Sequence, residues 1–415
     1  MPGITLRCFP DQRFKQGCLT FQLVRPMTPE EVSLNALIPA VLLRGSRRHP
    51  DLRSITMKLD ELYGGQICEM VRRVGDYQTT GLSCGFIDDR FALPGEQVLP
   101  EMVAFLGELL LEPLTENGIF VEEIVESEKK NLISALDSQR NDKRVYAMAQ
   151  MLKIMCREDS YGIPRLGTRE LVAAIDSETL YAHYQKILRE SRLELFYAGA
   201  APAEQVAALL RPILSRIDRC YVPLPGHTPF TGAPAGENLE ETELTQARLC
   251  MGFTTPVRTA DPLYAAIQVF NALFGAGMTS KLFMNVREKM SLCYGIGSAY
   301  YGAKGILTVS AGIDAEKAET VKAEVLHQLG LCCEGQITDQ EIEAARAAIL
   351  STLQGTHDSL GAIEGYYSTA RLSGLELTPE AYADRIRAVT REQVVEAART
   401  VALHTTYILR GVTEK

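Results

Sequence analysis

Histidine is a common zinc ligand in enzymes, so the histidines of this sequence are the first candidates for chemistry. There are six, with the closest two 30 residues apart: His49, His183, His227, His327, His357 and His404. A catalytic zinc site uses about three protein ligands, and two of them usually lie one helical turn apart. No helix here can present two imidazoles on one face, so the sequence predicts no bound metal.

The sequence also lacks the short motifs that mark nucleophilic or phosphate-binding sites. It contains no Gly-x-Ser-x-Gly elbow, no Walker loop and no dinucleotide-binding glycine motif after a strand. The ten cysteines form no Cys-x-x-Cys pair, which is typical of small buried side chains in a long cytosolic chain. The turn at Phe274–Gly277 leads into a helix, where it is either an anion site or simply a tight turn.

One stretch, from Phe274 to Asp314, has a more specific pattern. A glycine-rich turn leads into a helix, Arg287 lies near the end of that helix, and Tyr294 follows seven residues later at the start of a strand. Taken alone, the pattern is more typical of a surface arginine and a half-buried tyrosine than of a binding site.

The elements that position these residues occur twice in the chain. The amphipathic segment FVEEIVESEKKNLISALDSQ matches DQEIEAARAAILSTLQG at a constant offset of 217, which places Val125 on Ile342. Upstream, GLSCGFIDD parallels LTVSAGIDA, and Gly199 and Gly411 close two further matching segments. Strands and helices come in blocks rather than in strict alternation. We therefore predict an α+β fold of two homologous domains, each an antiparallel-type sheet covered by helices on one face.

A proline- and glycine-rich stretch from Cys220 to Asn238 has the composition of a linker. It predicts an N-terminal domain over 1–219, a linker over 220–238 and a C-terminal domain over 239–415. Capping boxes mark the start of one helix in each half. The first is Thr28–Glu31, with proline at the first helical position, and the second is Thr338–Glu341.

The bulk properties exclude several classes of protein. A chain of 415 residues exceeds what one core normally supports, and a net charge of −9 argues against a nucleic-acid partner. No apolar run approaches the roughly 18–20 residues needed to span a bilayer, and the N-terminus lacks the apolar core of a secretory signal. We expect a cytoplasmic protein without a membrane partner.

The stretch from Gly275 to Tyr294 resembles the second-half motif of the pitrilysin/insulinase-type zinc metallopeptidases, the group of mitochondrial processing peptidase. That motif runs Gly-x-Gly, Ser-[Arg/Lys]-Leu-Phe, Val-Arg-Glu and then Tyr, and it is nearly complete here. The duplicated halves, the linker and the length are similar to those of a small bacterial subunit. The resemblance implies two homologous domains that close like a clamshell around a peptide. A narrower resemblance is to paired relatives associated with modification of elongation factor P.

The first half departs from that family. Active members carry the inverted zinc motif His-x-x-Glu-His on the first long helix. Anchoring on Arg44-Gly45-Ser46 places Ala36 and Ala40 at the two histidines and Pro39 at the general-base glutamate. The third ligand, a glutamate on a later helix, falls at Ala135 in EKKNLISAL. The resemblance therefore implies a degenerate zinc site, and Pro39 should in addition kink the helix.

Within the resemblance, Arg287 and Tyr294 are retained while the zinc motif is missing. This implies that two different chains supply the zinc and the Arg/Tyr pair. In the family, this pair contacts the peptide backbone near the scissile bond. We predict a non-catalytic, metal-free subunit that pairs with a homologous His-x-x-Glu-His chain, the only holder of zinc, and that binds a peptide or unfolded polypeptide. One alternative is a catalytically inert scaffold or peptide-binding protein of the same fold. Another is an enzyme with unrelated chemistry.

Overall fold

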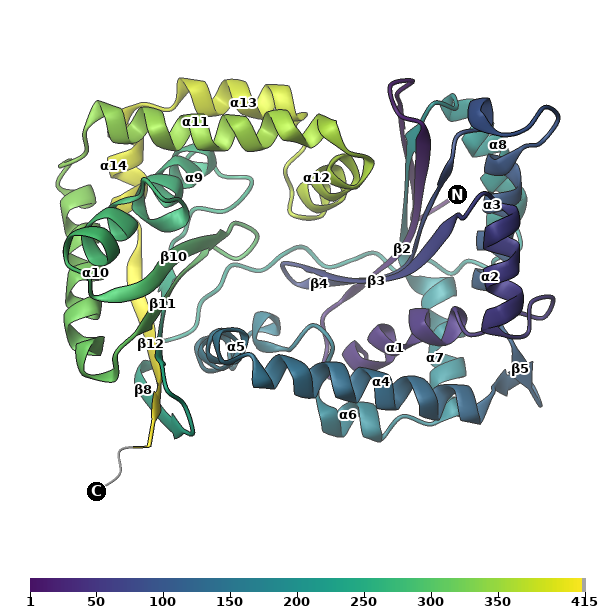
Figure 1. Ribbon diagram of the computed structural model, residues 1–415, viewed down its shortest axis with the longest axis horizontal. Helices are drawn as coiled ribbons and strands as arrows, with labels where there is room; N and C mark the ends of the chain where they lie inside the picture. The colour runs from purple at the N-terminus through teal and green to yellow at the C-terminus, as the bar shows by residue number, and fades with distance from the viewer. Residues whose placement is uncertain (413–415) are drawn as a thin grey trace. The chain divides into compact units, whose positions relative to one another are not determined.

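The computed structural model describes residues 1–412, which form two compact units with one five-stranded sheet each (Figure 1). Unit 1 comprises residues 1–137, 164–226 and 358–369, and unit 2 comprises 138–163, 227–357 and the residues from 370 onward. The boundary at 226/227 falls inside the stretch 220–238. Two segments are exchanged relative to a division at this linker. Residues 138–163 precede the linker but belong to unit 2, and residues 358–369 follow it but belong to unit 1.

Unit 1 contains one large sheet, a short hairpin and several helices, one of which comes from the second half of the chain. Its strands are β1 (Ile4–Pro10), β2 (Gln16–Pro26), β3 (Gln66–Val74), β4 (Tyr77–Ile87), β5 (Thr115–Glu116), β6 (Ile119–Phe120) and β7 (Arg192–Gly199). Its helices are α1 (Val32–Leu42), α2 (Leu52–Glu61), α3 (Val98–Leu111), α4 (Glu122–Asn141), α6 (Arg169–Ala173), α7 (Ser177–Glu190), α8 (Ala203–Leu214) and α12 (Leu360–Leu372).

Unit 2 repeats this arrangement with two π-helical turns in addition. Its strands are β8 (Gly236–Thr242), β9 (Ala247–Thr254), β10 (Cys293–Tyr301), β11 (Ile306–Ile313) and β12 (Ala402–Gly411). Its helices are α5 (Lys143–Met155), α9 (Tyr264–Asn271), α10 (Ala318–Cys333), α11 (Asp339–Gly355), α13 (Pro379–Ala388) and α14 (Arg391–Arg399). The π turns are η3 (Ala272–Ala276) and η4 (Phe283–Lys289).

The two sheets have the same strand order, which confirms the predicted duplicated α+β fold. The order is β1-β7-β2-β4-β3 in unit 1 and β8-β12-β9-β11-β10 in unit 2. In each sheet the outer pair, β1–β7 or β8–β12, is parallel and the other pairs are antiparallel. Alternate residues of β2, Leu19, Phe21 and Leu23, are buried in the main core with α1, α3 and α7.

The second face of each sheet is covered by a helix from the other half of the sequence. In unit 1, Ile363 of α12 packs on Phe196 and Ala198 of β7. In unit 2, α5 packs on β9 and β12 so closely that a Cβ at Gly252 would lie 2.5 Å from the sulfur of Met155. The equivalent helices α5 and α12, each following the longest helix of its half, are therefore exchanged between the units.

An ion pair with at least one buried side chain holds each exchanged segment. In unit 2 the side chain of Lys304 is fully buried, its Nζ lies 2.9 Å from Oδ2 of Asp159, just beyond α5, and it donates to Thr228. In unit 1, Arg72 Nη1 lies 2.8 Å from Oε2 of the buried Glu364 on α12, and Gln22 donates to the other carboxylate oxygen. Losing one partner of such a pair leaves an unpaired charge in a poor solvent.

Helix α1 begins differently from the sequence expectation. The predicted capping box at Thr28–Glu31 forms only in part: the Thr28 hydroxyl accepts from the amide of Glu31 at 3.3 Å, but the helix starts at Val32 and the Glu31 side chain makes no cap hydrogen bond. The Glu31 carboxylate instead accepts from Arg25 and Lys186 at 2.7 Å each, and these contacts, against the opposing effect of burial, lower its pKa to about 2. The capping box at Thr338–Glu341 is confirmed. At the first site, tertiary ion pairs thus engage the carboxylate that the second half of the box would use.

A buried polar network fixes the first turn of α1. His183 Nε2 lies 2.8 Å from Oδ1 of Asn35, and Asn35 Nδ2 donates to Gln78 at 2.9 Å. Gln78 in turn donates to the carbonyls of Val32 and Arg165. Burial is the main cause that lowers the pKa of His183 from 6.5 to about 4, so its imidazole is neutral at pH 7.

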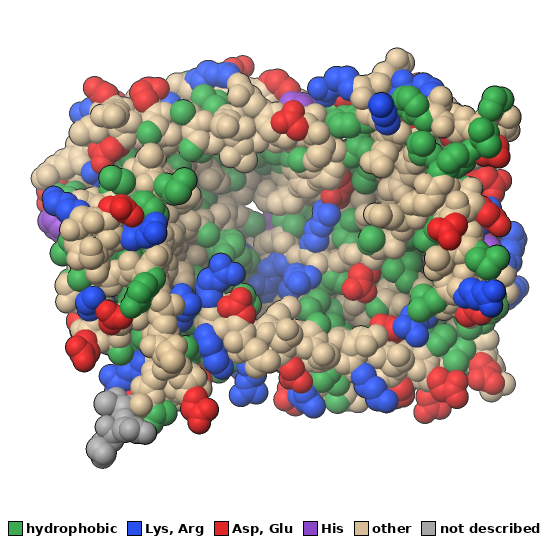
Figure 2. Space-filling view, in the orientation of Figure 1, with side chains coloured by type: hydrophobic (Ala, Val, Ile, Leu, Met, Phe, Trp, Pro, Cys, Tyr) green, Lys and Arg blue, Asp and Glu red, His purple; other side chains and the backbone are tan. Residues whose placement is uncertain are grey.

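The surface in Figure 2 shows charged side chains of both signs interspersed with apolar ones. Among residues 1–412, none of the helices combines the length and apolarity needed to cross a bilayer.

We predict that Lys304→Met destabilises the protein by about 3 kcal/mol, because it leaves Asp159 without its buried partner. Urea unfolding checks the loss, and hydrogen exchange should show faster exchange in α5. The matched control is Arg387→Met, which breaks the exposed pair with Asp384 and should cost less than about 1 kcal/mol. Equal losses in the two variants would contradict a special role for the buried pair.

A second prediction concerns pH. Between about pH 6.5 and 4 the unfolded chain binds a proton at His183 that the folded chain excludes, so stability falls as pH drops through this window. His183→Gln should flatten this slope by an amount corresponding to roughly 2–3 kcal/mol at pH 4. Unfolding curves at several pH values measure it, with exposed His327→Gln as the control. The idea fails if both variants keep the wild-type slope.

Candidate functional site

The four residues predicted to stand at degenerate zinc positions lie on α1 and α4 of unit 1. Ala36 and Pro39 are buried, Ala40 is half-buried, and α1 continues through Pro39 to Leu42. Ala135 lies on α4 and is exposed. None of the four side chains carries a lone pair or an ionisable group. This part of unit 1 is thus packed by methyl groups and a pyrrolidine ring where ligands would be needed.

The side chain of α4 that contacts the end of α1 is Glu128, two helical turns before Ala135. Its carboxylate is buried and accepts from Arg44 at 2.8 Å and from Asn131 at 3.0 Å. The sequence did not single out this residue, because the segment EKKNLISAL contains no invariant motif that fixes its alignment with the family pattern. A glutamate on the apolar face of an amphipathic helix is the feature that could have identified it. Arg44 neutralises the charge that a cation would otherwise balance. Among residues 1–412, no group of three or more His, Cys, Asp or Glu side chains could hold a metal ion.

Arg287 lies on η4 in unit 2. Its guanidinium is centred 4.6 Å from the ring centroid of Phe283, which lies four residues earlier, and Nη1 is 3.6 Å from Glu288. The carbonyl of Arg287 accepts from the amide of Ser291, which has a positive φ of 50° and ends the helical segment. The side chain is 40% exposed, so the ring orients the guanidinium without enclosing it.

Tyr294 follows at the start of β10, beside a β-bulge between Cys293 and Gly295. It is 65% exposed, and its hydroxyl donates to Oδ1 of Asp314 at 3.1 Å. Lys317 lies 2.8 Å from the other oxygen of Asp314, and together Lys317 and Tyr294 lower the pKa of that carboxyl. A bulge re-aims a side chain at a strand end. The tyrosine hydroxyl therefore lies at the surface and makes no hydrogen bond in the core.

The structure brings Arg287 and Tyr294 together on one segment. Helix η4 contacts β10, and the charge of Arg287 acts on the neighbouring Cys293, partly offsetting the burial that raises the pKa of this thiol. Two side chains that can bind a peptide carbonyl thus lie on adjoining elements of unit 2. Their roles toward a substrate stay predictions.

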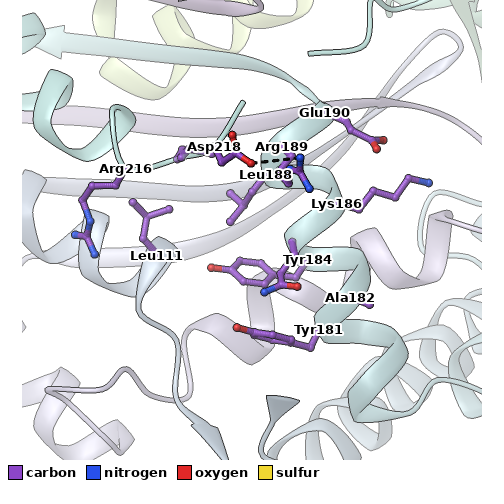
Figure 3. Close-up of a pocket in the computed structure, with 12 residues that line it drawn as sticks. Leu111, Tyr181, Ala182, Tyr184, Lys186, Leu188, Arg189, Glu190, Arg216 and Asp218 are labelled. Atoms are coloured by element: carbon purple, nitrogen blue, oxygen red, sulfur yellow. Dashed lines mark ion pairs between the residues drawn. The ribbon is translucent and has the colours of Figure 1, made fainter. Parts of the chain in front are cut away.

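A depression of about 530 Å³ elsewhere in unit 1 is lined by the second half of α7 and by residues that follow α8 (Figure 3). Tyr181 and Tyr184 form its aromatic side. Its cations already face carboxylates: Arg189 pairs with Asp218, Arg216 with Glu112 and Lys186 with Glu31. This depression does not have the chemistry of the predicted site.

Comparison with known proteins finds relatives of this chain in sequence and in fold. Residues 174–349 match the family described as "Peptidase M16 inactive domain". The chain is 28% identical over 409 residues to the "Probable inactive metalloprotease YmfF" of Bacillus subtilis (strain 168), covering 99% of this chain and 96% of that protein.

Two solved structures share the fold over nearly the whole chain. A conserved protein from Enterococcus faecalis V583 superposes with a TM-score of 0.91 at 29% identity, covering 100% of this chain and 97% of that one. A peptidase M16 inactive domain from Pseudomonas fluorescens superposes with a TM-score of 0.81. At 16% identity, over 99% of this chain and 97% of that one, this second likeness shows the fold alone.

The resemblance found in the sequence is thereby confirmed: the chain is similar to the peptidase M16 inactive domain over residues 174–349 and to a probable inactive metalloprotease over nearly its whole length.

Proposed function

We propose that this chain is the metal-free subunit of a heterodimeric zinc peptidase. It binds the peptide and supplies Arg287 and Tyr294 to the active site of a homologous partner that carries His-x-x-Glu-His. The observation that carries the proposal is an asymmetry between the units. The zinc positions of unit 1 are filled by alanines and a proline, while the hydroxyl of Tyr294 in unit 2 stays exposed.

The chemistry of the pair supports a role at a peptide bond. The guanidinium of Arg287, oriented by Phe283, can donate two hydrogen bonds to a backbone carbonyl. Tyr294 donates to Asp314 in the resting chain, so a rotation of its side chain about the Cα–Cβ bond would exchange that acceptor for the oxyanion of a tetrahedral intermediate. Asp314 keeps its pairing with Lys317 when the tyrosine leaves, which limits the cost of the exchange.

The alternative, an inert scaffold, predicts a different environment for Tyr294. In a protein without a role at a peptide bond, Tyr294 would be retained for packing and would be buried. A tyrosine that exposes most of its surface contributes little to a core. The exposure of Tyr294 therefore favours the catalytic complex over the inert scaffold.

We predict that Tyr294→Phe, co-purified with the wild-type partner, lowers kcat for a quenched fluorescent peptide by about 100- to 1000-fold. KM should change little, because the hydroxyl acts on the transition state. The control is Tyr300→Phe on the same strand, whose hydroxyl donates to the carbonyl of Val257 in the unit's interior. It should lower stability and leave kcat unchanged. A Tyr294→Phe complex as fast as the wild type would exclude the proposal.

The proposal also fixes where the metal lies. Metal analysis of the separated chains should find zinc in the partner and none above background in this chain. A chelator should abolish cleavage by the complex and leave the melting temperature of the isolated chain unchanged, because no metal contributes to its fold. Stoichiometric zinc in the isolated chain, lost together with stability on chelation, would contradict this assignment.

A further inference from the structure

The four edge strands of the two sheets differ in how they are protected. Exposed edges are normally blunted by charged residues or proline, which prevent unwanted pairing with another chain. Three of the edges follow this rule, and the residues are Arg7 and Pro10 on β1; Glu69, Arg72 and Arg73 on β3; and Glu237, Glu240 and Glu241 on β8. The fourth, β10, reads CYGIGSAYY and contains neither a charge nor a proline.

Strand β10 is also accessible along its length. Every residue from Cys293 to Tyr301 is at least partly exposed, and no strand within residues 1–412 pairs with its outer side. A Cβ at Gly295 would meet no heavy atom within 4 Å, and one at Gly297 would come no closer than 3.6 Å to any. Another backbone can therefore approach this strand.

Exposed apolar side chains gather in the segment that precedes β10. Met278, Met284 and Met290 are 76%, 48% and 43% exposed. The chain has 12 methionines, so a quarter of them stand exposed within 13 residues. Methionine is flexible and polarisable, and it serves surfaces that accept apolar side chains of varied shape. The segment also contains the π turn η4, and the π turn η3 ends two residues before it; this geometry recurs at functional sites.

These features together indicate what kind of molecule would bind along β10. A bare sheet edge offers a row of main-chain donors and acceptors, which only an extended backbone can satisfy. The adaptable methionines beside it favour a variable apolar sequence over one fixed partner surface. Arg287 and Tyr294 lie between Met284 and the glycines of β10, so a chain on this edge would pass both side chains.

We infer that the segment Met278–Tyr301 is a docking surface for an extended polypeptide with large apolar side chains, which pairs with β10 and places those side chains on the three methionines. The inference rests on the proposed function, since the docked chain is the peptide that Arg287 and Tyr294 contact. It adds the class of peptide, namely apolar segments of an unfolded polypeptide, and the surface that selects it.

The test uses the full isolated chain and two fluorescein-labelled 12-residue peptides. One alternates Leu or Phe with Gln, and in the other Ser replaces each Leu and Phe. The chain should bind the apolar peptide by fluorescence polarisation and the serine peptide at least about tenfold more weakly. Combined Met278→Gln, Met284→Gln and Met290→Gln should weaken binding of the apolar peptide by about tenfold or more, which corresponds to about 1.4 kcal/mol. The control is Met57→Gln, an exposed methionine of unit 1.

A second variant tests the strand edge. Ala299→Lys places a charge on an exposed position of β10 and should prevent pairing without lowering the melting temperature. Binding of the apolar peptide at wild-type strength by the triple methionine variant would overturn the inference. So would equal binding of the two peptides, or sedimentation of the wild type as a dimer that Ala299→Lys dissociates, because the occupant would then be a second copy.

The docking surface and the catalytic role can fail separately. Tyr294→Phe should bind both peptides as the wild type does, because a transition-state donor adds little to ground-state affinity. Methionine variants with weakened binding would support the surface even if Tyr294→Phe left the rate of the complex unchanged.

Discussion

Each sheet of this protein buries side chains on both faces, and the helices of its own half of the chain cover only one. The apolar side chains of the second face, such as Phe196 and Ala198 in unit 1, would otherwise stay in contact with water, so a second layer has to come from elsewhere. The chain solves this by exchange, with α12 on the sheet of unit 1 and α5 on the sheet of unit 2. The pairs Arg72–Glu364 and Lys304–Asp159 make each docking specific, because a shifted helix would leave the buried charge of Glu364 or Lys304 unpaired.

That constraint ties the two halves of the sequence together energetically. An N-terminal half cut at the linker would lack α12 and leave Arg72 and Asp159 without these partners. A C-terminal half would lack α5 and leave Lys304 and Glu364 without theirs. Duplication of the fold therefore did not produce two independent domains. It produced two units that share helices, which explains why the compact units depart from the division at the linker.

Helix α1 of unit 1 is held by side-chain interactions that need no metal. The network of His183, Asn35 and Gln78 fixes its first turn, and the pair of Arg44 with Glu128 fixes its end against α4. A charged arginine supplies the positive charge that a buried glutamate requires. In unit 2, by contrast, the irregular backbone is concentrated around Arg287 and Tyr294, in η4, at Ser291 and at the bulge of β10. Such irregularities cost stability and persist where a side chain has to be aimed.

The sequence by itself determined the repeat, the α+β class and the family resemblance, because hydrophobic periodicity and local motifs can be read from the order of residues alone. It also singled out Arg287 and Tyr294 as candidates, and it determined that Ala36, Pro39 and Ala40 cannot bind a metal, which follows from their side-chain chemistry. Only the tertiary structure decided the exchange of α5 and α12, the ion pairs that engage Glu31, and the contact of Glu128 with Arg44. Each of these joins residues distant in the chain, and no local spacing encodes a partner that another segment brings into contact.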